Sequence, residues 1–365
     1  MKTTIKKLTE ADKYSGPLGF KSIGGQGKTT LLKRIAHDHG ILAHFFRGVV
    51  YMEVGRTVQS VAPLLEKIAT ALKIKVETNN DDDGNKRERE IKKKLREQEG
   101  GHRMLLLLDN VWETSVQGVQ ELVKVCPEGI RVVLTTRQET VIAALKGEPI
   151  FLPKLPLEDA RSMLYDQCGE VELAEIVADL LVEVAYHHPL ALTHVATSLQ
   201  LKCKNGCTPM DVLNMIQDKS RLLSQRYKEV GMTAIFSCLA LSFEALDEVN
   251  KNVVMNMSEF PPEKVIPLGA MQILFGFEKR DYRIKIAVSS LKENSIVSEI
   301  DDNLVSIHGL MHEYLEEERK NHSKTYRDVK DNDMVKTALD YFNAFHFVCD
   351  GSRFDSLKTA MEKYG

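Results

Sequence analysis

The stretch Ser22-Ile23-Gly24-Gly25-Gln26-Gly27-Lys28-Thr29-Thr30 decides the fold of this 365-residue chain. It joins a short apolar run, Leu18–Ile23, to Lys28–His39, whose apolar residues recur at helical spacing. Glycines at such a junction let consecutive backbone N–H groups converge on phosphate oxygens, and the helix N-terminus adds partial positive charge. The sequence therefore predicts a phosphate-binding loop between a strand and a helix.

The side chains of this loop have distinct expected roles. Lys28 would reach the β- and γ-phosphates of a nucleotide, and the Thr29 hydroxyl would complete the shell of a Mg²⁺ ion. One position departs from the G-x-x-x-x-G-K-[ST] pattern, because Ser22 stands where the first glycine is expected. The alternative interpretation is a glycine-rich turn that opens a helix and binds no ligand. The remaining predicted nucleotide-binding residues of the loop are Gly24, Gly25, Gly27 and Thr30.

Two further polar residues stand at the ends of apolar runs. Met104–Leu108 ends at Asp109, and Ile130–Thr135 is closely followed by Arg137. In a parallel sheet both would lie at the carboxyl edge, next to the phosphate loop. We expect Asp109 to hold Mg²⁺ together with Thr29, and the Arg137 guanidinium to sense a γ-phosphate. Three such elements in this order predict the core of a phosphate-loop NTPase.

The pattern along the chain predicts three domains and a tail. Apolar strands alternate with helices over residues 1–152, which indicates an α/β phosphate-loop domain with a parallel sheet. Residues 153–228 have only helical periodicity and predict an all-α domain. Residues 229–320 have helices followed by the hairpin Ser295–Ile300 and Leu304–His308, the outline of a winged-helix domain. Residues 321–365 predict a helical tail, interpreted as the start of a further C-terminal region.

Composition excludes several classes of protein. Lys and Arg number 49 against 52 Asp and Glu, a net charge of −3, so no basic field favours nucleic acid or an anionic membrane. The longest strongly apolar run, Met104–Leu108, is far shorter than a membrane span. Cys203 and Cys207 lack a second ligand pair at zinc-site spacing. We therefore expect a soluble cytoplasmic protein that binds no nucleic acid.

Five segments together resemble a known family: GGQGKTTLLKRIA, LLLLDNVWE, RVVLTTRQETV, HHPLALTHVA and VSIHGLMHEYL. Their order and spacing over residues 18–320 resemble the NB-ARC module of plant disease-resistance receptors and apoptotic-protease activators, within the STAND class of ATPases. The resemblance implies that a nucleotide-binding domain, a helical domain and a winged-helix domain close over ADP. It also implies that Pro189 packs near the nucleotide and that His308 contacts the β-phosphate.

Several positions depart from the family pattern. Asn110 replaces a second aspartate after Asp109, and an amide cannot accept a proton from attacking water. Gly309 replaces the aspartate after His308, and it is expected at the N-cap of a helix that begins near Leu310. His187-His188 replaces a glycine pair before Pro189, and no adenine-contacting segment is recognisable in residues 1–17.

These observations predict an ADP/ATP-binding molecular switch in signal transduction, with a role in defence or cell death. ADP would define the off state, and ATP would define an on state that self-associates or engages protein partners. At most the chain would be a slow ATP hydrolase, with Asp109 and Asn110 at the catalytic position. One alternative is an NB-ARC scaffold that has lost nucleotide switching, and another is a phosphate-loop phosphotransferase.

Overall fold

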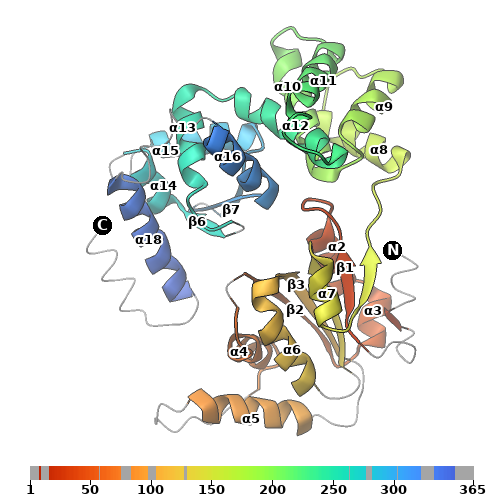
Figure 1. Cartoon of the computed structure of the whole chain (residues 1–365), viewed down its shortest axis with the longest axis vertical. Coiled ribbons are helices and arrows are strands. Elements are labelled where there is room, and N and C mark those ends of the chain that lie inside the picture. Colours follow the sequence, from red (N-terminus) through yellow and green to blue (C-terminus); the bar gives the residue numbers. More distant parts are fainter. Residues whose placement is uncertain are drawn as a thin grey trace. The chain divides into compact units, whose positions relative to one another are not determined.

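The computed structural model describes residues 8–9, 16–56, 58–74, 84–97, 104–126, 130–262, 264–276, 282–301, 303–321 and 333–349. The chain divides into two compact units, Met1–Pro153 and Lys154–Gly365, which Figure 1 shows in red to yellow and in green to blue. No helix among these residues is long and apolar enough to cross a membrane.

The first unit contains a parallel sheet of five strands in the order β2-β3-β4-β1-β5. This order places β4 between β1, which precedes the phosphate loop, and β3, which carries Asp109. The elements of the unit are β1 (Leu18–Lys21), α2 (Lys28–Ala36), α3 (His39–His44), β2 (Gly48–Gly55), α4 (Ala62–Ala71), α5 (Gly84–Glu97), β3 (Met104–Val111), the 3₁₀ turn η2 (Glu113–Ser115), α6 (Val116–Val125), β4 (Ile130–Thr136), α7 (Glu139–Ala144) and β5 (Glu148–Phe151).

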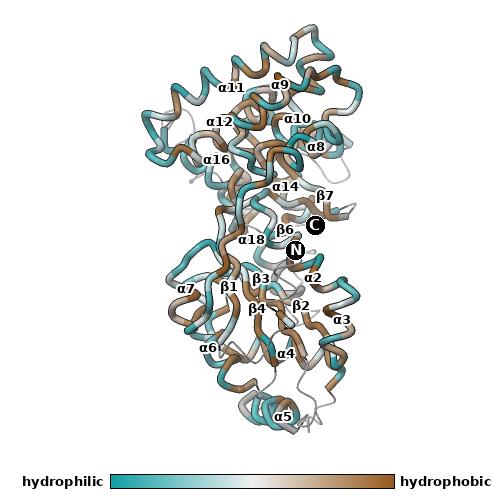
Figure 2. Tube along the Cα trace, turned by 90° about the vertical axis from the view of Figure 1, so that its right-hand side faces the viewer, coloured by the Kyte–Doolittle hydropathy of each residue, from teal (hydrophilic) through white to brown (hydrophobic). Residues whose placement is uncertain are grey.

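Helices cover both faces of this sheet, as predicted from strands that are apolar throughout. Leu105 and Leu107 of β3 face a core shared with α2 and α3, whereas Leu106 and Leu108 face a core shared with α4, α6 and α7. The charged helix α5 packs beside α4 and appears almost wholly hydrophilic in Figure 2. Its two apolar positions, Ile91 and Leu95, are both buried, as their isolation in a charged helix predicts.

The second unit is mostly helical. Its elements are α8 (Leu157–Cys168), α9 (Glu175–Val184), α10 (Pro189–Lys204), α11 (Pro209–Leu223), α12 (Val230–Glu244), α13 (Glu248–Met257), β6 (Val265–Pro267), α14 (Leu268–Leu274), α15 (Arg283–Glu293), β7 (Val297–Asp301), β8 (Leu304–Ile307), α16 (Gly309–Asn321) and α18 (Asp333–Cys349). Helix α12 is buried along nearly its whole length and contacts α10, α11 and α16. It therefore joins the helices before it to those after it.

The predicted hairpin is present as the antiparallel pair β7–β8. A third strand, β6, pairs with β8 and was not predicted, because three residues ending in proline give too short an apolar pattern. The elements from α12 to α16 thus match the predicted order of helices followed by a hairpin. The assignment of this part as a winged helix, like the domain boundaries at 228 and 320, stays a prediction.

The predicted tail contains one described helix, α18, which packs against α14. The rings of Phe260 and Phe342 lie 5.0 Å apart. A Cβ atom on Gly269 would lie 2.5 Å from the Tyr341 ring, so this close approach requires glycine in α14. Residues 322–332 and 350–365 of the predicted tail lie outside the described residues.

Candidate functional site

The phosphate loop has the backbone geometry that its glycines predict. Gly25 and Gly27 have φ values of +72° and +88°, a region that residues with a Cβ rarely adopt. Gly27 is the N-cap of α2, and no side chain caps the helix there. The backbone N–H groups of the first helical turn are therefore not engaged by a capping side chain, which is the arrangement that binds phosphate at a helix N-terminus. Thr29 and Thr30 are exposed in that turn.

The Lys28 ammonium folds back over the loop. Its Nζ donates to the carbonyl oxygens of Ser22 (2.7 Å) and Ile23 (2.8 Å), and to the Ser22 hydroxyl at 3.3 Å. Ser22 has no positive φ, so the backbone at this position does not require the glycine of the usual pattern. Serine therefore fits the loop and adds a side-chain acceptor for Lys28.

Asp109 is a buried carboxylate, with 3% of its surface exposed. The Tyr51 hydroxyl donates to its Oδ2 at 2.8 Å, and the Thr135 hydroxyl donates to its Oδ1. Burial and the Asp109 charge together hold the pKa of Tyr51 well above its usual value, so Tyr51 is a neutral donor. The carboxylate is thus fixed from β2 on one side and from β4 on the other.

Asn110 has a defined structural role beside Asp109. Its φ of +59° is a left-handed conformation that asparagine tolerates better than most residues. Its backbone N–H donates to Thr135 Oγ1 at 2.8 Å, and its Oδ1 accepts from Trp112 Nε1 at 2.7 Å. The amide at the predicted base position therefore holds the Trp112 ring.

Arg137 lies at the same edge of the sheet. Its guanidinium carbon is 5.5 Å from the centroid of the Trp112 ring, and that of Arg56 is 3.8 Å from the same ring. Arg137 directly follows β4, whose neighbours in the sheet are β1 and β3, and its guanidinium lies near the Trp112 ring that Asn110 holds. The structure places the sequence-predicted residues of the first unit at one edge of one sheet.

The chemistry of this edge fits a magnesium nucleotide. A hydroxyl in the first turn of α2 (Thr29) and the Asp109 carboxylate are hard oxygen donors of the kind that Mg²⁺ prefers. The uncapped N-terminus of α2 and Lys28 supply positive charge for phosphates. No group of three or more His, Cys, Asp or Glu side chains able to hold a metal ion occurs among the described residues.

Two predicted contacts, Pro189 and His308, belong to the second unit. Pro189 is in the first turn of α10, and the buried His188 before it is the N-cap. His308 precedes α16, and its Nδ1 accepts from the Leu310 N–H at 3.1 Å. His308 also lies close enough to His194 of α10 to lower the pKa of that buried ring. The second unit thus brings α10 and His308 together.

The prediction that Gly309 is the N-cap of this helix is wrong. Helix α16 begins at Gly309 itself, and the imidazole of His308 caps it. A histidine ring nitrogen replaces the aspartate oxygen that the sequence pattern lacks. The first turn of α16 therefore has a side-chain acceptor, which His308 supplies.

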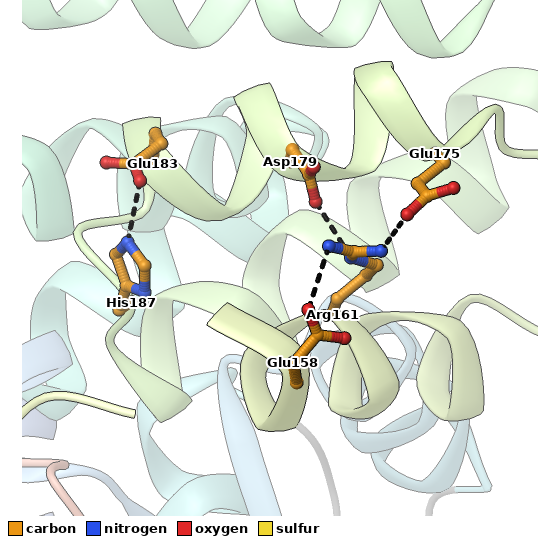
Figure 3. A network of polar contacts seen from close by, with 6 residues as sticks. All are labelled: Glu158, Arg161, Glu175, Asp179, Glu183 and His187. Atoms are coloured by element: carbon orange, nitrogen blue, oxygen red, sulfur yellow. Dashed lines mark hydrogen bonds and ion pairs between the residues drawn. The ribbon is translucent and has the colours of Figure 1, made fainter. Parts of the chain in front are cut away.

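A polar network precedes α10 (Figure 3). Arg161 of α8 pairs with Glu158, with Glu175 and, at 2.8 Å, with Asp179, so it ties α8 to α9. His187 contacts Glu183 through Nε2 at 3.0 Å and the Leu155 carbonyl through Nδ1 at 3.1 Å. The turn before Pro189 is therefore fastened both to α9 and to the segment that opens the second unit.

Tyr51, Thr135 and Trp112 are site residues that the sequence pattern did not predict. Thr135 had a usable signal, since it is polar and two residues before Arg137 on an apolar strand. Tyr51 had a weaker one, because aromatic residues are common in strands. Its contact with Asp109 depends on the pairing of β2 with β3, which the sequence does not specify.

Comparison with known proteins agrees with this fold. Residues 1–168 match the family model of the NB-ARC domain. The "Probable disease resistance protein At4g33300" of Arabidopsis thaliana is 25% identical over 281 residues, which cover 74% of this chain and 31% of that protein. The disease resistance RPP13-like protein 4 of Arabidopsis thaliana is 23% identical over 272 residues, covering 68% and 29%. The chain thus spans about a third of the length of these curated relatives.

A solved structure with the same fold is the STAND protein with a tetratricopeptide repeat sensor, PH0952, from Pyrococcus horikoshii. The likeness has a TM-score of 0.53 at 15% identity and covers 96% of this chain and 48% of that one. The likeness lies in the fold, a five-stranded parallel sheet with its phosphate loop followed by a mostly helical part. The sequence match to the NB-ARC domain model covers residues 1–168, the part that contains the phosphate-loop sheet.

Proposed function

We propose that this chain is an ADP/ATP-dependent switch in which the bound nucleotide selects the state of the molecule. The observation that carries the proposal is the gathering of Lys28, Asp109 and Arg137 at one edge of the sheet, next to the uncapped N-terminus of α2. Each group matches one part of a magnesium nucleotide: the ammonium and the helix N-terminus match the β- and γ-phosphates, and the carboxylate matches the metal.

The residues of the first unit would bind and orient the phosphates. Gly24, Gly25 and Gly27 expose backbone N–H groups, while Lys28 and Arg137 add charge. Thr29 and Asp109 would hold Mg²⁺, which when bound neutralises phosphate charge. Asn110 cannot take a proton from water, and its amide oxygen already accepts from Trp112. Hydrolysis would therefore be slow, and the population of each state would carry the signal.

The second unit would read which nucleotide is bound. Pro189 at the start of α10 and His308 at the start of α16 are the proposed contacts to ADP. Because His308 Nδ1 accepts from Leu310 N–H, the ring proton of the neutral form lies on Nε2, where it can be donated to a phosphate oxygen. Exchange of ADP for ATP would remove this contact and allow self-association or binding of a protein partner. The names of the relatives support a role in defence signalling.

A scaffold without nucleotide switching is the second candidate. It is favoured by the contacts of Lys28, whose ammonium has three acceptors within its own loop, one of them the Ser22 hydroxyl. Phosphate would have to displace these acceptors. The two candidates differ in whether the purified protein retains or binds ADP, so direct binding separates them.

Lys28→Ala should weaken ADP binding about tenfold to a hundredfold, because a charge-assisted contact contributes about 1.5–3 kcal/mol. The measurement is ADP affinity by calorimetry, with nucleotide released from denatured wild-type protein identified by chromatography. Lys33→Ala is the matched control, since it removes a lysine that is exposed on the same helix. Equal ADP affinity for Lys28→Ala and Lys33→Ala would take the phosphate loop out of the proposed function. Absence of ADP binding by the wild type would favour the scaffold.

A further inference from the structure

Asp109 is held by hydroxyl groups from both neighbouring strands. Tyr51 of β2 donates to Oδ2, and Thr135 of β4 donates to Oδ1. The carboxylate is 3% exposed, whereas the Tyr51 side chain is 37% exposed. The tyrosine ring therefore lies at the surface of the sheet edge with its hydroxyl directed at a buried carboxylate.

The strand register explains how this contact arises. Glu53 of β2 is directly opposite Asp109, and Tyr51 is two residues earlier on the same face of that strand. The length of a tyrosine side chain spans this diagonal separation. On the other side, Thr135 is opposite Phe20, the residue before the last one of β1. The two hydroxyls thus come from strands on opposite sides of β3, at the height where the phosphate loop begins.

We propose that Tyr51 is the positioning residue of the magnesium carboxylate, a role that rests on the nucleotide-binding function proposed above. An ionised carboxylate has about four acceptor sites, so two hydroxyl contacts leave acceptor sites for a metal or its water. With both oxygens fixed, the carboxylate keeps one orientation toward the loop. Without the tyrosine hydroxyl, Asp109 retains only the Thr135 contact and can turn about it, so the metal loses a pre-oriented ligand.

The test compares ATP affinity with Mg²⁺ and with excess EDTA, using displacement of a fluorescent ATP analogue as the readout. Tyr51→Phe removes one oxygen from a side chain that is more than one third exposed, so the variant should fold. We expect the Kd of ATP in Mg²⁺ to rise about tenfold to a hundredfold, the range that loss of a contact to a metal ligand usually produces. The Kd in EDTA should stay unchanged.

Tyr165→Phe is the matched control, because Tyr165 of α8 is also 37% exposed and lies in the other unit. Asp109→Asn sets the upper limit of the effect. A second variant, Tyr51→Leu, removes the ring as well and should lose the same Mg²⁺-dependent part of the affinity. Circular dichroism of each variant checks that the fold is retained.

The outcomes separate this proposal from the function on which it rests. A wild-type protein that binds ATP neither with Mg²⁺ nor with EDTA would overturn the proposed function itself. Wild-type binding with an unchanged Mg²⁺ effect in Tyr51→Phe would overturn only the role of Tyr51. An equal loss of affinity in Mg²⁺ and in EDTA would also overturn it, since the hydroxyl would then support the loop and not the metal carboxylate. If Mg²⁺ did not change the ATP affinity of the wild-type protein, the proposed role of Tyr51 would likewise be overturned.

Discussion

His194 lies within α10 with 1% of its surface exposed, and its Nδ1 is 2.7 Å from the Ser242 hydroxyl of α12. Burial, and secondarily the neighbouring His308, lower the pKa of His194 to about 3. A histidine in this environment is neutral at every pH at which the protein would be studied. The side chain is thus a buried, neutral hydrogen-bonding group.

This neutral histidine should make the fold sensitive to mild acid. Between pH 6.5 and about 3 the unfolded chain binds a proton at His194 and the folded chain does not, so the free energy of unfolding falls as pH falls. The loss approaches about 1.4 kcal/mol per pH unit, or roughly 2 kcal/mol from pH 7 to pH 5. The contribution is fully present above pH 6.5. His194→Asn, which can retain a bond to Ser242 but cannot ionise, should lose roughly 2 kcal/mol less over this interval.

Urea unfolding at pH 7 and pH 5 measures that difference. Carboxylates and other histidines titrate over the same interval, so the quantity of interest is the wild-type loss minus the variant loss. Should the two proteins lose stability equally, the His194 site would have to admit the charged form of the ring, and its burial would not control stability in acid.

At the scale of elements, the apolar runs in the sequence predicted the strands and the sheet edge at which they end. The helix boundaries were less predictable, because they depend on side-chain caps. The helix expected over Lys28–His39 ends at Ala36 because Asp38 caps a new helix, accepting from the N–H groups of Gly40 and Ile41. Such local hydrogen bonds override periodicity, and the sequence pattern contains little sign of them. The boundary at His308 has the same cause, since histidine is not among the usual N-cap residues.

The candidate site was predictable where one residue type has one common role. Lys28 and Asp109 followed from motif and strand end, and both lie at the predicted edge. Tyr51, Thr135 and Trp112 depend on register and on contacts between strands, which a single sequence does not specify. The sequence therefore predicted the residues proposed to bind the nucleotide, but not the side chains that contact and orient residues of the site.

The turn between α9 and α10 contacts the first residues of the second unit and holds them in place. Tyr186 and His187 have φ values of +59° and +54°, a strained pair for residues with large side chains. Both contact the start of the second unit: Lys154 Nζ is 3.0 Å from the centroid of the Tyr186 ring, and the His187 ring contacts the Leu155 carbonyl. The turn is thereby fastened to residues 154 and 155.

His187→Ala should loosen this segment, because it removes the imidazole contact with the Leu155 carbonyl. The backbone bond from the Leu155 N–H to the His187 carbonyl remains, but it is long, at 3.4 Å. Trypsin cleaves after lysine, so cleavage of the Lys154–Leu155 bond in the native protein should become several-fold faster. Glu183→Ala should change the rate little, since Glu183 is exposed and its contact with His187 is screened by solvent. Mass spectrometry of the fragments identifies the bond. Equal rates in wild type and His187→Ala would show that other contacts hold the segment.

At the scale of the whole molecule, the residues proposed to bind nucleotide come from both compact units. The first unit supplies the phosphate loop, Asp109 and Arg137, and the second supplies Pro189 and His308. Within the second unit, His308 lies within electrostatic reach of His194 of α10. The proposed switch can be tested at His308, because this residue has two roles that different substitutions can distinguish: it caps α16, and it is proposed to contact the nucleotide.

His308→Asn and His308→Ala should behave differently in stability and alike in nucleotide binding. Asparagine is a strong N-cap residue and can accept from Leu310 N–H, whereas alanine cannot and should lower the free energy of unfolding by about 1 kcal/mol. Alanine has no side-chain N–H, and the shorter asparagine, with its Oδ1 held by the Leu310 N–H, does not extend its Nδ2–H as far as the imidazole Nε2–H. Both variants should therefore release ADP faster, by about tenfold for a lost hydrogen bond to a charged group. The small-angle scattering radius of the ADP-bound protein should rise in both. Faster release in His308→Ala alone would mean that the ring acts only as the cap of α16, and equal release rates in all three proteins would remove His308 from the switch.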